Sequence, residues 1–211
     1  ATWRGARAVS EVYRRQVRLG SHCGGKRSWD NAQAHFRPDP GRAPSGARGE
    51  AFVIAAGAAH GAMRTRDVVA NAHDAGAAAA RAAGAEGAVG AAPQGDAPEE
   101  SPMQPVWMMP QGAGHKLRAK MWLDYQNDVK VADVQLAAQE GYESVEHTKR
   151  YTTLGMATDQ GKLSNINGLA VLSDALGQPI PATGTTTFRP PYTPISMGAI
   201  AGEARGEPFQ P

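Results

Sequence analysis

The stretch 84–114 limits what this chain can fold into. It consists largely of Ala, Gly, Pro and Glu, and it has almost no large apolar residue before the run Val-Trp-Met-Met at 106–109. Such a composition cannot bury enough apolar surface to become ordered by itself, so we expect a linker over residues 84–114. The linker leaves two short parts of a 211-residue chain, and each can build only a small core.

The first part, residues 1–83, predicts an incomplete α/β arrangement. Glycine and proline in 21–46 indicate turns and short strands, with Trp29 and Phe36 as apolar anchors. The apolar run 51–56 predicts a buried strand that passes through a glycine turn into a helix over 65–83. That helix has a face of small residues suited to packing on a sheet. The apolar residues within 9–19 also recur at helical intervals, which predicts a helix there.

This strand, turn and helix form half of a nucleotide-binding arrangement, because the turn can bring backbone N–H groups close to a phosphate or ribose. The phosphate-binding pattern G-x-G-x-x-G is absent from the sequence. The first part therefore cannot form a complete dinucleotide site.

The second part predicts a small helical module over residues 115–181. A strand over 117–125 is followed by three helices, each ended by a glycine. The first helix starts at or just after Asp128, the second runs over 144–152, and the third over 166–176. Inward-facing residues are expected as follows: Val131, Val134, Ala137 and Ala138 in the first helix, and Val145, Thr148 and Tyr151 in the second. The caps are Ser144, and Ser164 or Asn165. Residues 182–211 predict an extended tail, because Pro190 and Pro191 exclude a helix.

Composition excludes several classes of function. The net charge of +2 is too small to indicate a nucleic-acid partner. The single cysteine, Cys23, excludes an internal disulfide and cannot alone supply a zinc or iron–sulfur site. No run of about 18 apolar residues is present, so we expect no membrane partner. The single cysteine and the absence of a signal-peptide core favour the cytoplasm.

One loop gathers polar residues that can hold a phosphate. Two cations and several hydroxyls surround a glycine-bearing turn, and we assign them to cofactor binding. The guanidinium group of Arg can donate two parallel hydrogen bonds to a phosphate, and the ammonium group of Lys carries a compact positive charge. The residues are Arg150, Thr152, Thr153, Thr158, Gln160, Gly161 and Lys162. The alternative is that they cap helices and satisfy the backbone of the loop. A metal site from Asp124, Asp128 and Asp159 is a weaker alternative, because Asp128 suits a helix start.

Three motifs resemble a known family. DYQNDV, VEHTKRYTTLGMATDQGK and GTTTFRPPYTP resemble, in this order, the linker module of the alpha subunit of heterotetrameric sarcosine oxidase, over about residues 115–205. Upstream, SHCGGKRSWDNAQAHFRPD and AAGAAHGA resemble the end of the NAD-binding domain of that subunit. The resemblance implies an internal portion of a longer chain, with residues 1–83 as a truncated domain end and 182–211 leading toward a missing folate-binding domain.

The family implies a function for the whole complex. It oxidatively demethylates sarcosine to glycine, passes the one-carbon unit to tetrahydrofolate and produces hydrogen peroxide. FAD belongs to the beta subunit, NAD to the alpha subunit, and FMN to their interface, where beta holds it covalently. The implied partners are the beta, gamma and delta subunits, and the part alone is expected to be inactive. The alternative is a cofactor-free docking module of a related amine or amino-acid dehydrogenase.

A more distant resemblance concerns the helical module, which is similar to a two-iron ferredoxin-like domain. The four cysteine positions of that domain fall on Asp124, Gln126, Asp159 and Ser164, which cannot bind a cluster that needs thiolates. We therefore expect the scaffold without an iron–sulfur cluster.

Two departures from the related chains carry expectations of their own. Gly57 and Ala58 fall where related flavin-binding domains have Gly-Asp. Ala58 cannot hold a ribityl hydroxyl, which suits an NAD-type ligand. Residues before about 18 depart from the pattern of the related chains, and we hypothesise that they are translated from a shifted reading frame.

Overall fold

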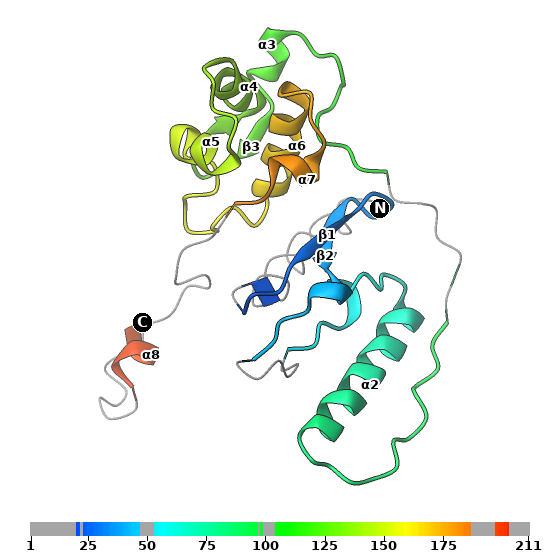
Figure 1. Cartoon of the computed structure of the whole chain (residues 1–211). Coiled ribbons are helices and arrows are strands. Elements are labelled where there is room, and N and C mark those ends of the chain that lie inside the picture. The colour runs from blue at the N-terminus through cyan, green and yellow to red at the C-terminus, as the bar shows by residue number, and fades with distance from the viewer. Residues whose placement is uncertain are drawn as a thin grey trace. The chain divides into compact units, whose positions relative to one another are not determined.

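A computed structural model describes residues 20, 21, 23–46, 53–96, 98, 104–186 and 197–202. The chain forms two compact units, Ala1–Val106 and Trp107–Pro211. Their boundary lies inside the stretch that the sequence assigns to a linker. The predicted helix over 9–19, the reading-frame hypothesis and the proline-containing part of the tail lie outside the described residues. Figure 1 shows the elements of each unit.

The first unit begins with a β-hairpin. Strand β1 (Arg27–Asp30) pairs antiparallel with β2 (His35–Pro38), and Trp29 lies opposite Phe36. Their rings meet edge to face with centroids 4.9 Å apart. Cross-strand aromatic pairs of this kind stabilise a hairpin by up to about 1 kcal/mol. The short strands are thereby confirmed, while the two aromatics, which we expected to anchor this piece against a larger part, contact each other across the hairpin. The 3-10 helix η1 (Pro40–Arg42) follows.

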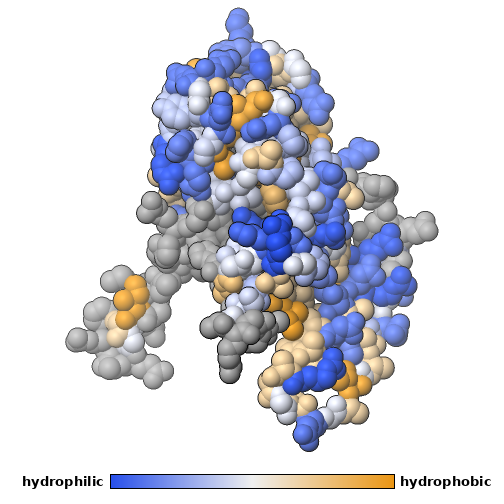
Figure 2. Space-filling view, viewed as in Figure 1, coloured by the Kyte–Doolittle hydropathy of each residue, from blue (hydrophilic) through white to orange (hydrophobic). Residues whose placement is uncertain are grey.

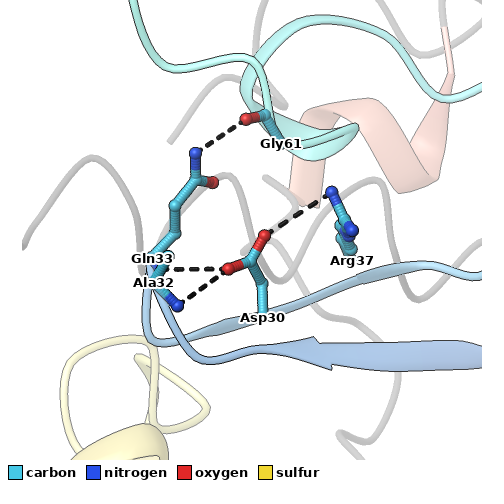
Figure 3. Close-up of polar contacts among 5 residues, drawn as sticks. All are labelled: Asp30, Ala32, Gln33, Arg37 and Gly61. Atoms are coloured by element: carbon cyan, nitrogen blue, oxygen red, sulfur yellow. Dashed lines mark hydrogen bonds and ion pairs between the residues drawn. The ribbon is translucent and has the colours of Figure 1, made fainter.

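The hairpin turn contacts a glycine turn further along the chain. The Oδ1 atom of Asp30 accepts the N–H groups of Ala32 at 2.9 Å and Gln33 at 3.1 Å, and Arg37 lies 3.5 Å from the other carboxylate oxygen. The Gln33 Nε2 atom donates to the Gly61 carbonyl at 3.0 Å, as Figure 3 shows. This bond ties the hairpin to the turn after η2 (Gly57–Ala59).

The predicted buried strand before this turn is wrong for its described residues. Residues 53–56 have no regular structure, and Ile54 is 49% exposed. An apolar strand needs neighbouring strands to satisfy its backbone groups. No strand among the described residues pairs with this run, so its apolar pattern alone does not produce a sheet.

The predicted helix that follows is confirmed as α2 (Thr65–Ala82). Its alanines are the strongest helix formers, which accounts for its length. None of its residues is buried, and at the lower right of Figure 2 its surface is pale orange interrupted by blue. The small-residue face therefore has the composition for packing on a sheet, but no sheet covers it among the described residues.

His35 makes the hairpin sensitive to acid. Its side chain is buried, and burial lowers its pKa below the ordinary 6.5, although nearby Asp30 acts in the opposite direction. A lowered folded-state pKa gives stability that is present above pH 6.5 and is lost as the pH falls through the folded pKa. We expect hydrogen exchange of residues 27–38, corrected for its intrinsic rate, to speed up below pH 6.5, with up to about 1.4 kcal/mol lost per pH unit. The change His35→Leu should abolish this dependence, and a dependence that persists in the variant would contradict it.

The described residues of the stretch 84–114 contain no helix or strand. The second unit then starts with the short helix α3 (His115–Arg118) and a hairpin of β3 (Trp122–Asp124) and β4 (Val129–Lys130). The predicted strand over 117–125 is thus too long. Its first residues are helical, and Tyr125 is 68% exposed because it stands in the turn between the strands.

Three helices follow as predicted: α4 (Val131–Gln139), α5 (Val145–Thr152) and α6 (Asn165–Ala175). The three helices pack together, as Figure 1 shows for this unit, and their buried side chains form a small apolar core. Burying each large apolar side chain stabilises the unit by about 1.5–3 kcal/mol. The core side chains are Leu123, Val129, Val131, Val134, Ala137, Val145, Leu154, Leu169, Val171 and Leu172. The short helices α7 (Ile180–Thr183) and α8 (Met197–Ala201) complete the described elements, so the predicted extended tail over 182–211 is wrong at residues 182–183 and 197–201.

The inner face and the caps differ from expectation. Tyr151 is 43% exposed and stacks on Tyr142, with ring centroids 4.5 Å apart, while Lys149 is buried instead. Ala138 is only half-buried. Ser144 and Ser164 occupy the cap positions without a side-chain cap bond. The α4 helix begins after Lys130, whose N–H donates to Asp133 at 2.8 Å, so Asp128 is a turn residue.

Candidate functional site

The loop between α5 and α6, residues 153–164, is held by the turn that joins β3 to β4. Both carboxylate oxygens of Asp124 accept backbone N–H groups, and the aspartate is only 3% exposed. Three bonds join the turn to the loop: Gly155 N to Asp124 Oδ2 at 2.7 Å, Asp159 N to Gln126 Oε1 at 3.0 Å, and Asn127 Nδ2 to the Thr153 carbonyl at 2.9 Å. The loop is therefore a fixed part of the module.

The inner side of the loop fits around one amide side chain. Gly155 and Gly161 both have φ of +67°. A methyl group added to either would collide with the Asn165 side chain. The Nδ2 atom of Asn165 donates to Thr186 Oγ1 at 2.6 Å, so the same amide also holds the chain after α7. Only glycine gives the left-handed backbone and the close approach at these two positions.

The outer side carries the predicted cofactor-binding residues, and several are engaged locally. The Arg150 Nη1 atom donates to the Glu146 carbonyl at 2.8 Å and to its carboxylate at 3.1 Å. The Thr152 hydroxyl donates to the Thr148 carbonyl, and the Thr153 hydroxyl to the Thr152 carbonyl. These bonds pair the three side chains with backbone carbonyls of α5, which is local use of the kind that the alternative describes.

The rest of the predicted set lies further along the loop. Thr158 is exposed and Lys162 is half-buried. Gln160 donates to the Ala157 carbonyl at 3.2 Å, and the N–H of Gly161 donates to Asp159 at 2.9 Å. The structure thus places all seven residues at one helix end and loop, but Arg150, Thr152, Thr153 and Gln160 already form hydrogen bonds within the module.

Gly57 and Ala58 lie in the first unit, within η2. Gly57 has φ of +62°, and its N–H donates to Asn71 Oδ1 at 2.7 Å. This N–H is therefore already satisfied by the helix that follows, and it is not free to hold a nucleotide phosphate.

The metal alternative has no support among the described residues. Within them, no three His, Cys, Asp or Glu side chains lie close enough to share an ion. Asp124 and Asp159 both accept backbone N–H groups of the loop, and Asp128 has a φ of +50° in the turn. The structure also places the positions that align with the cysteines of the ferredoxin-like domain. A hydrogen bond joins two of them, from the Asp159 N–H to Gln126 Oε1, and a third, Ser164, is buried next to Asn165.

Sequence reasoning missed Asp124 and Asn165 as organising residues. A local signal existed for the first, because Asp124 accepts the N–H groups two and three residues ahead, as Asp30 does in the other hairpin. Asp and Asn favour such turns. No local pattern marks the bond from Asp124 to Gly155, which spans 31 positions.

Comparisons with known proteins agree on one family. Residues 118–203 match the model of the sarcosine oxidase A3 domain. The sarcosine oxidase alpha subunits of Corynebacterium sp. strains P-1 and U-96 are 38% and 40% identical over 97% of this chain, and that of Rhizobium meliloti is 50% identical over 51% of it. The chain spans 20% of each of the first two relatives and 10% of the third. In the described part of the chain, no helix has the length and apolar character needed to cross a bilayer.

Proposed function

Because this chain is a homologue of part of the sarcosine oxidase alpha subunit, with an A3 domain over residues 118–203, we propose that it serves as a segment of such an oxidoreductase subunit. The observation that carries the proposal is the alignment of 97% of the chain with two alpha subunits. The proposed reaction of the whole complex is the oxidative demethylation of sarcosine to glycine, with transfer of the one-carbon unit to tetrahydrofolate and production of hydrogen peroxide.

In this proposal the helical module lies at the interface with the beta subunit, near FMN. What supports it is the loop between α5 and α6, which carries Thr158 and Lys162 four positions apart on a backbone held by Asp124 and Gln126. A lysine is suited to a phosphate as a point charge. Bound FMN would supply electron transfer, and the loop would only position and neutralise its phosphate.

The fit to a phosphate is partial. Arg150, Thr152 and Thr153 have partners in the module, so they would reach a phosphate only after giving these up. We assign the contact to Thr158, which is exposed, and to Gln160 and Lys162, which are half-buried and so partly open to solvent, with Gly161 allowing the turn. In the first unit, Gly57 and Ala58 would form only the rim of an NAD site, which the remainder of a longer subunit would complete.

The second candidate is a cofactor-free docking module, in which the helices only join subunits. The local bonds of Arg150, Thr152 and Thr153 favour it, because they give these residues a structural role. The polar density of the loop favours the first candidate, since the centre of a docking face is depleted in charge.

Replacing Lys162 separates the two candidates. In the complex assembled from alpha, beta, gamma and delta subunits at limiting flavin, we expect Lys162→Met to lower FMN content. Loss of one charge contact of about 1.4 kcal/mol would weaken, by up to about tenfold, the noncovalent binding of FMN that precedes its covalent attachment. The measurement is the flavin absorbance per complex after purification.

Lys120→Met is the matched control, because Lys120 is exposed on the same unit and outside the loop. FMN content that is equal in the two variants and the unchanged complex would favour the docking module. Failure of the chain to join a complex with any of these subunits would contradict both candidates.

A further inference from the structure

The residue that ends helix α5 has an unfavourable backbone conformation. Thr153 follows the helix directly with φ of +62° and ψ of +14°, which is the left-handed region. Glycine is the usual residue at such a helix end, because it has no β-carbon to collide with the backbone. A side chain branched at the β-carbon, as in threonine, is a genuine outlier there. Thr153 is therefore strained at a position where glycine would be relaxed.

The bonds that Thr153 forms within the module do not account for this strain. Its carbonyl accepts Asn127 Nδ2 at 2.9 Å and the Met156 N–H at 3.1 Å, and a glycine would keep both bonds. Among the described residues, its hydroxyl forms one hydrogen bond, to the Thr152 carbonyl at 2.6 Å, and this bond is exposed. An exposed bond between neighbouring residues adds little to stability. The side chain thus costs the free module more than it contributes.

The other strained residues of the second unit lie on the same surface. In the described part of this unit, the non-glycine residues with left-handed φ are Asp128 at +50°, Thr153 and Gln160 at +53°. All three belong to the turn between β3 and β4 or to the loop that this turn holds. Strained residues gather where a protein binds a ligand or another chain. The strain therefore indicates that this surface contacts another molecule.

The exposed side chains near Thr153 define the kind of molecule. Met156, whose N–H donates to the Thr153 carbonyl, is 50% exposed, and Tyr125, in the turn that contains Asn127, is 68% exposed. Aromatic residues and methionine are enriched at protein–protein interfaces, and charged residues are depleted at their centres. Asp159 is the only charged residue between positions 153 and 161. This composition fits a polypeptide surface, and the stretch gives no positive charge to a nucleic acid or an acidic membrane.

We propose that Thr153 contacts the partner subunit directly, with its hydroxyl oxygen accepting a hydrogen bond from an N–H group of that subunit. The hydroxyl proton already binds the Thr152 carbonyl, so the oxygen is open only as an acceptor. The partner is the beta subunit, so this contact rests on the proposed function, but it does not involve flavin. It lies at the opposite end of the loop from Lys162.

Three substitutions test the contact. Thr153→Gly should raise the thermal unfolding midpoint of the free chain by about 4 °C, because it removes the strain. In the assembled complex it should weaken binding of the beta subunit about fivefold, because one hydrogen bond is lost. Thr153→Val keeps the branched side chain, so it should weaken binding equally without raising the midpoint. Thr153→Ser keeps the hydroxyl and should bind within about twofold of the unchanged chain. Circular dichroism measures the midpoint, and dilution of the complex with labelled beta subunit measures the affinity.

Ala34→Gly is the matched control, because Ala34 also has a left-handed φ, of +50°, but lies in the hairpin of the first unit. It should leave binding of the beta subunit unchanged. The contact is overturned by an unraised midpoint in Thr153→Gly, by unaltered binding in both Thr153→Gly and Thr153→Val, or by equal losses in Thr153→Ser and Thr153→Val. If Lys162→Met lowers FMN content while the Thr153 variants bind normally, the proposed function stands and this contact alone fails. A chain that joins no complex would overturn both.

Discussion

Replacing Gly155 or Gly161 with alanine is expected to destabilise the helical module by about 3 kcal/mol or more. Two costs combine: a left-handed backbone costs a non-glycine residue about 1–2 kcal/mol, and forcing a methyl group into a packed site costs a further 1–3 kcal/mol. At both positions the added methyl would collide with Asn165, and at Gly155 it would also come within 2.9 Å of the Gly161 α-carbon. Urea unfolding followed by circular dichroism measures the loss.

Gly177→Ala is the matched control for this prediction. Gly177 has φ of +63°, close to the +67° of the other two, but nothing lies within 4 Å of an added methyl group. It should therefore lose only the backbone cost of about 1–2 kcal/mol. Equal losses in Gly155→Ala and Gly177→Ala would show that the Asn165 contact contributes nothing.

Asp124→Ala is expected to cost about 3 kcal/mol, because it removes the acceptor for the N–H groups that hold the turn and the loop. Asp124 is 3% exposed and accepts Gln126 N at 2.9 Å, Asn127 N at 3.1 Å and Gly155 N at 2.7 Å. Hydrogen bonds to a charged group contribute about 1.5–3 kcal/mol, and a buried donor left without an acceptor costs about 1–3 kcal/mol. Since domains have only about 5–15 kcal/mol of stability, this loss is large. It is measured by the same urea unfolding.

Asp133→Ala provides the comparison for Asp124→Ala. Asp133 also accepts a backbone N–H, that of Lys130 at 2.8 Å, but this bond is local and only half-buried. We expect a loss of about 1 kcal/mol, as for other helix caps. Losses of similar size in the two variants would mean that the bond from Asp124 to Gly155 adds little. Asp124→Asn, which keeps one carbonyl oxygen, should fall between them.

Both predictions concern the loop that also carries the proposed cofactor contact. If the loop positions Lys162 near FMN, Gly161→Ala and Asp124→Ala should lower FMN content in the assembled complex as well as stability. A loop that serves only to join helices would lose stability with no change in flavin content. The flavin measurement on these variants thus adds a second, independent comparison to Lys162→Met.

The sequence by itself determined the positions of the main helices. Alanine content and spacing predicted α2 to within one residue of its C-terminal end, and glycine stops predicted the ends of α4 and α6 closely. The predicted end of α5 at Thr152 is also confirmed, but the left-handed residue that follows it is Thr153 and not Gly155. These features are local, because helix propensity, capping and left-handed turns depend on a few neighbouring residues. The motifs of the second half likewise resembled the family whose A3-domain model matches residues 118–203.

Only the tertiary structure decided which side chains meet. In the structure Tyr151 is exposed and Lys149 is buried. The Asp124 carboxylate accepts the Gly155 N–H, and Gly155 and Gly161 both lie against the Asn165 side chain. Contacts between residues tens of positions apart depend on how the helices pack, and packing is set by the shape of the whole core. The local periodicity of the sequence therefore does not predict these long-range contacts.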